Sequence, residues 1–157
     1  MKLRTLNLIA PMAAFIALAL TTAAAPKLPS AAPAKKPTIT VYKDPGCGCC
    51  KKWIEHLIKH GYHVDARDTP GMAEIKRTLG VPHRIAACHT AVVNGYLIEG
   101  HVPAADIDRL LAQRPTVAGL AVPGMPMGSP GMEGGIAQRY QVVSFDKSGK
   151  TAVFASH

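Results

Sequence analysis

The chain has 157 residues and a formal net charge of +8, because 18 Lys and Arg residues outnumber 10 Asp and Glu residues. This length suits one domain with one core. The basic residues are scattered and aromatic residues make up 5% of the chain, which argues against a nucleic-acid surface built from clustered charge and stacked rings. We interpret the positive excess as a solvated basic surface.

The N-terminal residues have the pattern of a secretory signal peptide. Lys2 and Arg4 form a basic start, an apolar stretch follows from Leu8 to Leu20, and small residues run from Thr21 to Ala25. The apolar stretch of about 13 residues is shorter than the roughly 20 that span a bilayer. We therefore predict cleavage and export rather than a membrane anchor.

Composition divides the chain into three predicted segments. They are a signal peptide at 1–24, a flexible linker at 25–37 that is rich in Pro, Ala and Lys, and a folded domain at 38–157. Export places the four cysteines of the domain in an oxidising compartment, where thiols either pair or are held by a metal. Both outcomes stay open from composition alone.

The first half of the domain predicts strand, helix, strand and helix. Thr38 to Tyr42 is β-branched and aromatic, and Tyr62 to Arg67 has the character of a second short strand. One helix is predicted over Lys51 to His60, and another from Thr69-Pro70 to Gly80. The residues expected on the buried faces of the two helices are Trp53, Ile54, Leu57, Ile58, Met72, Ile75 and Leu79.

The second half predicts a hairpin, a helix and a further hairpin. Asn94-Gly95 is a typical two-residue hairpin turn, and a third helix starts at Pro103. Tyr140 to Phe145 and Thr151 to Phe154 form a C-terminal hairpin after a loop rich in Met, Gly and Pro. The predicted order, β-α-β-α-β-β-α with this loop and hairpin added, indicates an α/β, thioredoxin-like fold.

Three cysteines, Cys47, Cys49 and Cys50, lie at the predicted start of the first helix. Unpaired N–H groups and the helix dipole stabilise a thiolate there, and Lys51 and Lys52 add positive charge. Thiolates are both the nucleophiles of disulfide exchange and the ligands of soft metals. The third sulfur exceeds what exchange requires, so the pattern favours a metal, with copper as the first candidate.

A fourth cysteine, Cys88, precedes the predicted hairpin, where thioredoxin-like proteins have a loop with a cis-proline. Here His89 stands where that proline would be expected, which gives the loop two potential ligands. We expect four sulfurs to converge, with a buried structural cysteine or a plain disulfide as the alternative. Surface exposure is expected for His56 and His60, and no metal role is assigned to the singly placed histidines, which are His63, His83, His101 and His157.

Three methionines, Met125, Met127 and Met132, lie in the loop rich in Gly and Pro. Methionines normally fill cores, and a loop of this composition has little core to fill. A thioether is a preferred ligand of Cu(I) and does not form disulfides. We therefore favour a role in copper coordination over simple burial, and expect the C-terminal hairpin to fold the loop back toward the cysteines.

Five motifs in one order make the chain resemble the CopG copper-resistance proteins of Gram-negative bacteria, which are unrelated to the ribbon-helix-helix repressor of the same name. The motifs are Cys47-Gly48-Cys49-Cys50, Cys88-His89-Thr90-Ala91, Gly100 to Ala104, Gly119 to Pro126 and Gly128 to Glu133. The resemblance implies a periplasmic, thioredoxin-like protein that holds copper at the CxCC turn, assists copper tolerance and handles Cu(I) and Cu(II). It also implies that Cys47, Cys49, Cys50 and Cys88 are the main ligands and that Met125 and Met132 are the next candidates. Four thiolates carry up to four negative charges, so several Cu(I) ions are expected.

Two other hypotheses for the role of the cysteines stay open. A thiol-disulfide oxidoreductase would use Cys47 as nucleophile and Cys50 as resolving thiol, although the proline loop is missing. A structural zinc site would also satisfy four sulfurs, but three ligands in one turn strain its geometry. The expected partners are copper ions and other periplasmic copper-handling proteins, without nucleic acid or a membrane anchor after cleavage, and an enzymatic activity is left open.

Overall fold

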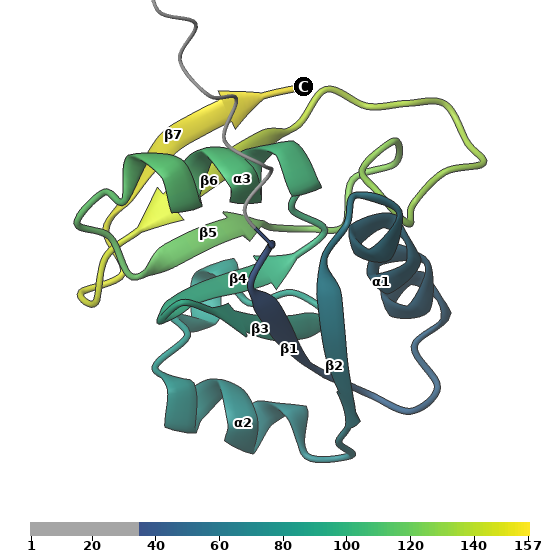
Figure 1. The fold of residues 1–157 in the computed structure, drawn as a ribbon, viewed down its shortest axis with the longest axis horizontal. Helices are drawn as coiled ribbons and strands as arrows, with labels where there is room; N and C mark the ends of the chain where they lie inside the picture. The colour runs from purple at the N-terminus through teal and green to yellow at the C-terminus, as the bar shows by residue number, and fades with distance from the viewer. Residues whose placement is uncertain (1–34) are drawn as a thin grey trace, which may run out of the picture. The chain divides into compact units, whose positions relative to one another are not determined.

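The structure is a computed structural model that describes residues 35–157. The predicted signal peptide and most of the predicted linker lie outside the described residues. In chain order, the elements are β1 (Thr38–Lys43), α1 (Gly48–Lys59), β2 (His63–Asp68), α2 (Met72–Leu79), the short 3-10 helix η1 (His83–Ile85), β3 (His89–Val93), β4 (Tyr96–Gly100), α3 (Ala104–Gln113), β5 (Gly119–Val122), β6 (Gln141–Phe145) and β7 (Thr151–Ser156) (Figure 1).

All seven strands belong to one mixed sheet in the order β2-β1-β3-β4-β5-β6-β7. β1 and β2 are parallel and are connected through α1, whereas β3 pairs antiparallel with both β1 and β4. The α/β class is confirmed, and the elements up to α3 follow the predicted order. The thioredoxin-like character of this arrangement stays a prediction.

Strand β5 was not predicted, and it joins the C-terminal hairpin to the rest of the sheet. It pairs parallel with β4 and antiparallel with β6. All four of its residues are buried, so the strand lacks the alternation of apolar and polar residues that marks a half-exposed strand. The predicted hairpin is present as β6 and β7, and through β5 it extends the sheet rather than forming a separate unit.

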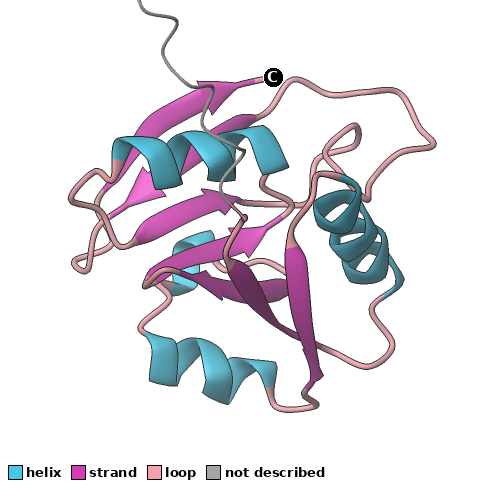
Figure 2. Ribbon diagram, viewed as in Figure 1, coloured by secondary structure: helices cyan, strands magenta, loops and turns pink. Residues whose placement is uncertain are grey.

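Two of the helices, α1 and α3, pack into one hydrophobic core with the strands (Figure 2). The main core cluster contains Trp53 and Leu57 from α1 together with Ile107 and Leu110 from α3, and all four side chains are fully buried. Burial of each such side chain removes apolar surface from water and stabilises the fold by about 1.5–3 kcal/mol. This shared core places the start of α1 against the ends of the central strands.

One prediction of burial was wrong. Ile58 is 54% exposed, because it lies about 100° around the helix from Leu57, at the edge of the apolar face.

The predicted inward side of α2 is correct, since Met72, Ile75 and Leu79 are half-buried, but no residue of this helix is fully buried. The physical reason is that Lys76 of α2 reaches the sheet, where its Nζ lies 2.9 Å from the Thr90 hydroxyl and forms an ion pair with the buried Glu99 carboxylate.

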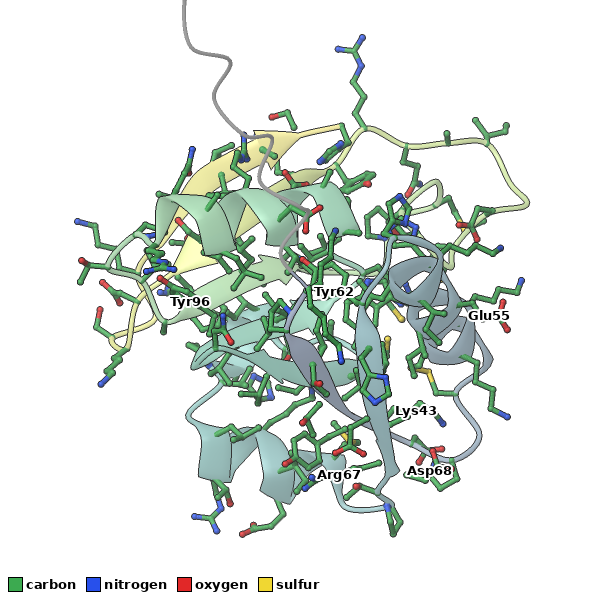
Figure 3. All side chains as sticks on the ribbon, in the orientation of Figure 1. Lys43, Glu55, Tyr62, Arg67, Asp68 and Tyr96 are labelled. Atoms are coloured by element: carbon green, nitrogen blue, oxygen red, sulfur yellow. A yellow bond between two sulfur atoms is a disulfide. The ribbon has the colours of Figure 1, made fainter. Side chains whose placement is uncertain are left out.

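The carboxyl ends of β1 and β2 are held together by a charge pair next to the cysteine turn. Lys43 is 3% exposed, and its Nζ lies 2.5 Å from Asp68 Oδ1 and donates to the Asp44 carbonyl at 3.2 Å (Figure 3). Because Asp44 begins the turn that leads to α1, this contact ties the turn to the end of β1.

Candidate metal centre

The turn before α1 is organised by hydrogen bonds to Asp44. Its side chain accepts from the Gly46 N–H at 2.9 Å and its carbonyl accepts from the Cys47 N–H at 3.1 Å. Cys47 is the N-cap of α1, and its Sγ accepts from the Cys50 N–H at 3.3 Å. The prediction that the first helix begins at the cysteines is confirmed, because α1 starts at Gly48.

A disulfide joins Cys47 to Cys50, whereas Cys49 and Cys88 are free. The expectation of three thiolates in the turn therefore applies only to the reduced protein. Cys49 Sγ lies 3.5 Å from Cys47 Sγ, so the free thiol of the turn is adjacent to the disulfide.

Four sulfurs converge as expected. The Sγ atoms of Cys47, Cys49, Cys50 and Cys88 all lie within 4.8 Å of one another, although Cys88 comes from the loop before β3. Burial, and then the neighbouring Cys49, raise the pKa of the Cys88 thiol to about 12. Cys88 is therefore protonated at neutral pH, and a metal that binds its sulfur must displace that proton.

His101, for which the sequence predicts no metal role, lies at this site. It is fully buried, and its Nε2 is 3.2 Å from Cys88 Sγ. The pairing of β3 with β4 could have revealed it: Thr90 lies opposite Glu99, so extending the same register by two residues puts Cys88 opposite His101. The Asn94-Gly95 turn sets this register.

Both histidines beside Cys88 are held in defined positions. His101 Nδ1 lies 2.7 Å from the Pro130 carbonyl, which can only accept; Nδ1 therefore donates, and Nε2 presents its lone pair toward Cys88. His89 is fully buried, its Nδ1 is 3.4 Å from Cys88 Sγ, and its ring centroid is 4.3 Å from that of Trp53. Burial lowers the pKa of both imidazoles, so both are neutral at neutral pH.

The loop that carries the methionines packs back onto the start of α1 through Gly131, as expected. A Cβ at this buried glycine would lie 2.7 Å from the Cys49 carbonyl oxygen and 2.9 Å from the Trp53 nitrogen. Met125 is 41% exposed and Met132 is half-buried. Met127 is also half-buried, and the ligand role of all three stays a prediction.

The two histidines on α1 differ from each other. His60 is exposed, as expected, whereas His56 is half-buried and its Nε2 accepts a hydrogen bond from the Ala104 N–H at 3.1 Å. Ala104 begins α3, and its N-cap residue Pro103 provides no capping side chain. The expectation of a surface role for His56 was therefore wrong, because its imidazole caps another helix.

Comparison with solved structures identifies the family. Two structures described as "Copper resistance protein copG", in Form 1 and Form 2, are each 47% identical to this chain, with a TM-score of 0.73. Each alignment covers 78% of this chain and 98% of the other. The chain belongs to the CopG copper resistance family. The resemblance drawn from the five motifs is confirmed.

A further comparison concerns part of the chain. A family model described as "Protein of unknown function, DUF411" matches residues 85–132, which include Cys88, His89, His101 and the methionines of the loop. No curated protein matches this CopG chain. Within residues 35–157, no helix combines the length and apolar character that a membrane crossing needs.

Proposed function

We propose that this CopG protein binds Cu(I) through four cysteine sulfurs and contributes to copper resistance in the periplasm. One observation carries the proposal: Cys47, Cys49, Cys50 and Cys88 bring their sulfurs within 4.8 Å of one another, in a family whose solved members are named for copper resistance. Copper is the bound cargo, and the four cysteine side chains are its proposed ligands.

The donor chemistry of the site fits Cu(I). Thiolates are soft ligands that select Cu(I), and the helix N-terminus stabilises their negative charge. Four thiolates carry up to four charges, which one monovalent ion cannot balance, so we propose that the site holds several Cu(I) ions. Met125 and Met132 are the proposed additional ligands, because their loop packs on the start of α1 through Gly131.

The disulfide makes copper loading depend on reduction. Cys47 and Cys50 bind a metal as thiolates, and their paired sulfurs are not thiolates. An external thiol reductant supplies the two electrons and two protons that convert the disulfide to two thiols, and is itself oxidised to a disulfide; copper then displaces the protons. We therefore propose that the reduced protein takes up Cu(I) and that the oxidised protein offers only Cys49 and Cys88.

The test is an anaerobic titration of the reduced mature protein with Cu(I), in which bound copper per protein is measured for the parent, Cys49→Ser and Cys88→Ser. Both cysteine variants are expected to bind less copper, whereas the exposed Thr78→Ser on α2 serves as a control that binds as the parent does. X-ray absorption at the copper edge reports valence, sulfur count and copper-copper neighbours together. Unchanged, tight stoichiometry in both cysteine variants would rule out the four-sulfur site.

A second candidate function is thiol-disulfide exchange, and the Cys47–Cys50 disulfide at the start of α1 favours it. In that case Cys47 is the nucleophile and Cys50 the resolving thiol. Metal-free protein with a thiol reductant would then reduce insulin, and turnover would survive Cys49→Ser and Cys88→Ser. Absence of turnover in the parent would refute this alternative.

A further inference from the structure

The carboxylate of Glu99 holds the chain on both sides of Cys88. Glu99 lies on β4, and its side chain is fully buried. Its Oε1 accepts a hydrogen bond from the Ala87 N–H at 2.6 Å, and its Oε2 accepts one from the Thr90 hydroxyl at 2.7 Å. Ala87 directly precedes Cys88, and Thr90 follows it by two residues. One carboxylate therefore spans the segment that carries the sulfur of Cys88.

Lys76 of α2 fixes this carboxylate in turn. Its Nζ forms an ion pair with Glu99 Oε1 and donates to the Thr90 hydroxyl oxygen at 2.9 Å. The side chain of Lys76 is 14% exposed, so both charges are largely removed from water. A hydrogen bond to an ionised group is roughly twice as strong as one between neutral groups. The loop before β3 thus has a firmer anchor than a neutral acceptor would provide.

Close packing locates the same residue of the loop. Gly100 ends β4 with a φ of +72°, and a Cβ there would lie 2.7 Å from the Ala87 Cβ and 2.8 Å from the Val122 carbonyl oxygen. Ala87 is therefore packed against Gly100 while its N–H is bonded to Glu99. Two adjacent residues of β4 set its position, one by contact and one by a hydrogen bond.

The free energy that a buried ion pair costs indicates a role beyond stability. Apolar side chains of similar volume often stabilise a core as well as such a pair does. We propose that Glu99, held by Lys76, is a positioning residue that acts through Ala87 and Thr90 and keeps the Cys88 sulfur within reach of the cysteine turn. Outer partners of this kind orient the groups that bind a metal. The effect on copper affinity rests on the proposed function, whereas the position of Cys88 rests on geometry alone.

Two double variants separate positioning from the effect of charge. Lys76→Met/Glu99→Gln removes both charges and keeps an amide oxygen that can accept from Ala87. Lys76→Met/Glu99→Leu removes both charges and the acceptor as well. Neither variant leaves one buried charge without its partner, so a difference between the two reports the contacts to the loop.

The readout is the rate at which iodoacetamide alkylates Cys88, with peptide mass spectrometry to locate the label. Each variant is made in oxidised, metal-free Cys49→Ser protein, in which the disulfide leaves Cys88 as the one free thiol of the four cysteines. Glu74→Gln/Arg77→Met is the matched control, because it removes an exposed ion pair from the same helix, and it should react as the Cys49→Ser protein does. Thermal unfolding of each variant checks that it folds.

The variant with leucine should be alkylated about fivefold faster than the variant with glutamine, which corresponds to about 1 kcal/mol, or one neutral hydrogen bond. The excess should stay constant at low urea concentrations, because a local opening exposes little surface, whereas global unfolding depends steeply on urea. Equal rates for the two variants would overturn the proposal. An excess that rises with urea as steeply as global unfolding does would also overturn it, since it would reflect stability alone.

Copper affinity is measured separately, in reduced protein that keeps all four cysteines, by competition with a chromogenic Cu(I) chelator. The variant with leucine should bind Cu(I) about tenfold more weakly than the variant with glutamine. Equal affinities would overturn the role of Glu99 in copper binding. A parent protein that binds no Cu(I) would refute the proposed function instead, and the alkylation rates, which are measured without copper, would still decide whether Glu99 positions Cys88.

Discussion

Substitution of Gly131 by alanine tests whether the methionine loop is locked onto the start of α1. Gly131 has a φ of +87° and is buried. A side chain in this left-handed region costs roughly 1–2 kcal/mol. The new Cβ would also lie 2.7 Å from the Cys49 carbonyl oxygen and 2.9 Å from the Trp53 nitrogen, and overpacking of this kind costs about 1–3 kcal/mol. The helix backbone cannot yield easily, so we expect a total loss of roughly 2–5 kcal/mol.

Gly124→Ala is the matched control in the same loop. Its φ is +78°, and a Cβ there would meet no atom within 4 Å, so only the conformational cost of roughly 1–2 kcal/mol is expected. Urea unfolding of the oxidised, metal-free proteins, followed by Trp53 fluorescence, measures both losses. If the two variants lose the same free energy of unfolding within about 0.5 kcal/mol, the close packing of Gly131 on α1 does not exist in solution.

The Gly131 substitution also has a consequence for the ligands. Pro130, the preceding residue, accepts the hydrogen bond that orients His101. Because His101 in turn contacts the proposed ligand Cys88, a displaced loop should weaken Cu(I) binding by the reduced protein, whereas Gly124→Ala should not. Equal Cu(I) affinity for the two glycine variants would show that the loop does not support the position of Cys88 through His101.

Three further predictions concern other contacts. Lys76→Ala leaves the buried Glu99 carboxylate without its charge partner and should lower the free energy of unfolding by about 3–5 kcal/mol. Arg77→Ala is the control, because it removes an exposed ion pair and should cost less than about 1 kcal/mol. Similar losses for the two variants in urea unfolding would contradict the buried ion pair. Burial, and then a neighbouring histidine of the same helix, lower the pKa of His56 below 6.5. The neutral imidazole that accepts from Ala104 thus contributes stability that is present above about pH 6.5 and is lost as the pH falls through the lowered pKa. His56→Gln keeps an acceptor that does not titrate, so its unfolding free energy should fall less than that of the parent between about pH 7.5 and about pH 5; parallel pH profiles would refute the capping role. Finally, an anaerobic Cu(I) titration without reductant should load fewer ions than the same titration after reduction, because the disulfide withholds two sulfurs; equal loading would show that the disulfide is absent or irrelevant.

Several features of the fold were predictable because their signals are local. Asn94 and Gly95 both adopt positive φ values, 47° and 83°, as the favoured two-residue hairpin turn requires. The apolar spacing of α1 predicted that Trp53, Ile54 and Leu57 are buried, and Gly80 ends α2 in the left-handed conformation that glycine tolerates. Each of these signals is contained within a few consecutive residues.

Other features depend on contacts that no short segment contains. β5 is four residues long and buried on both faces, so it becomes recognisable as a strand only when β4 and β6 lie beside it. The ion pair between Lys76 of α2 and Glu99 of β4 is another example, because the two residues are 23 positions apart in the sequence. His56 is half-buried only because α3 begins against it.

The sequence by itself determined the chemistry of this protein: three cysteines at a helix start, a fourth ahead of a hairpin, and motifs that assign the chain to the CopG family. Tertiary structure decided which of those groups meet. Cys88 reaches the turn because β3 pairs with β1, and His101 reaches Cys88 because β4 folds back along β3. Ligand type is a property of single residues, whereas ligand spacing depends on strand register and loop packing, and only the folded chain brings them together.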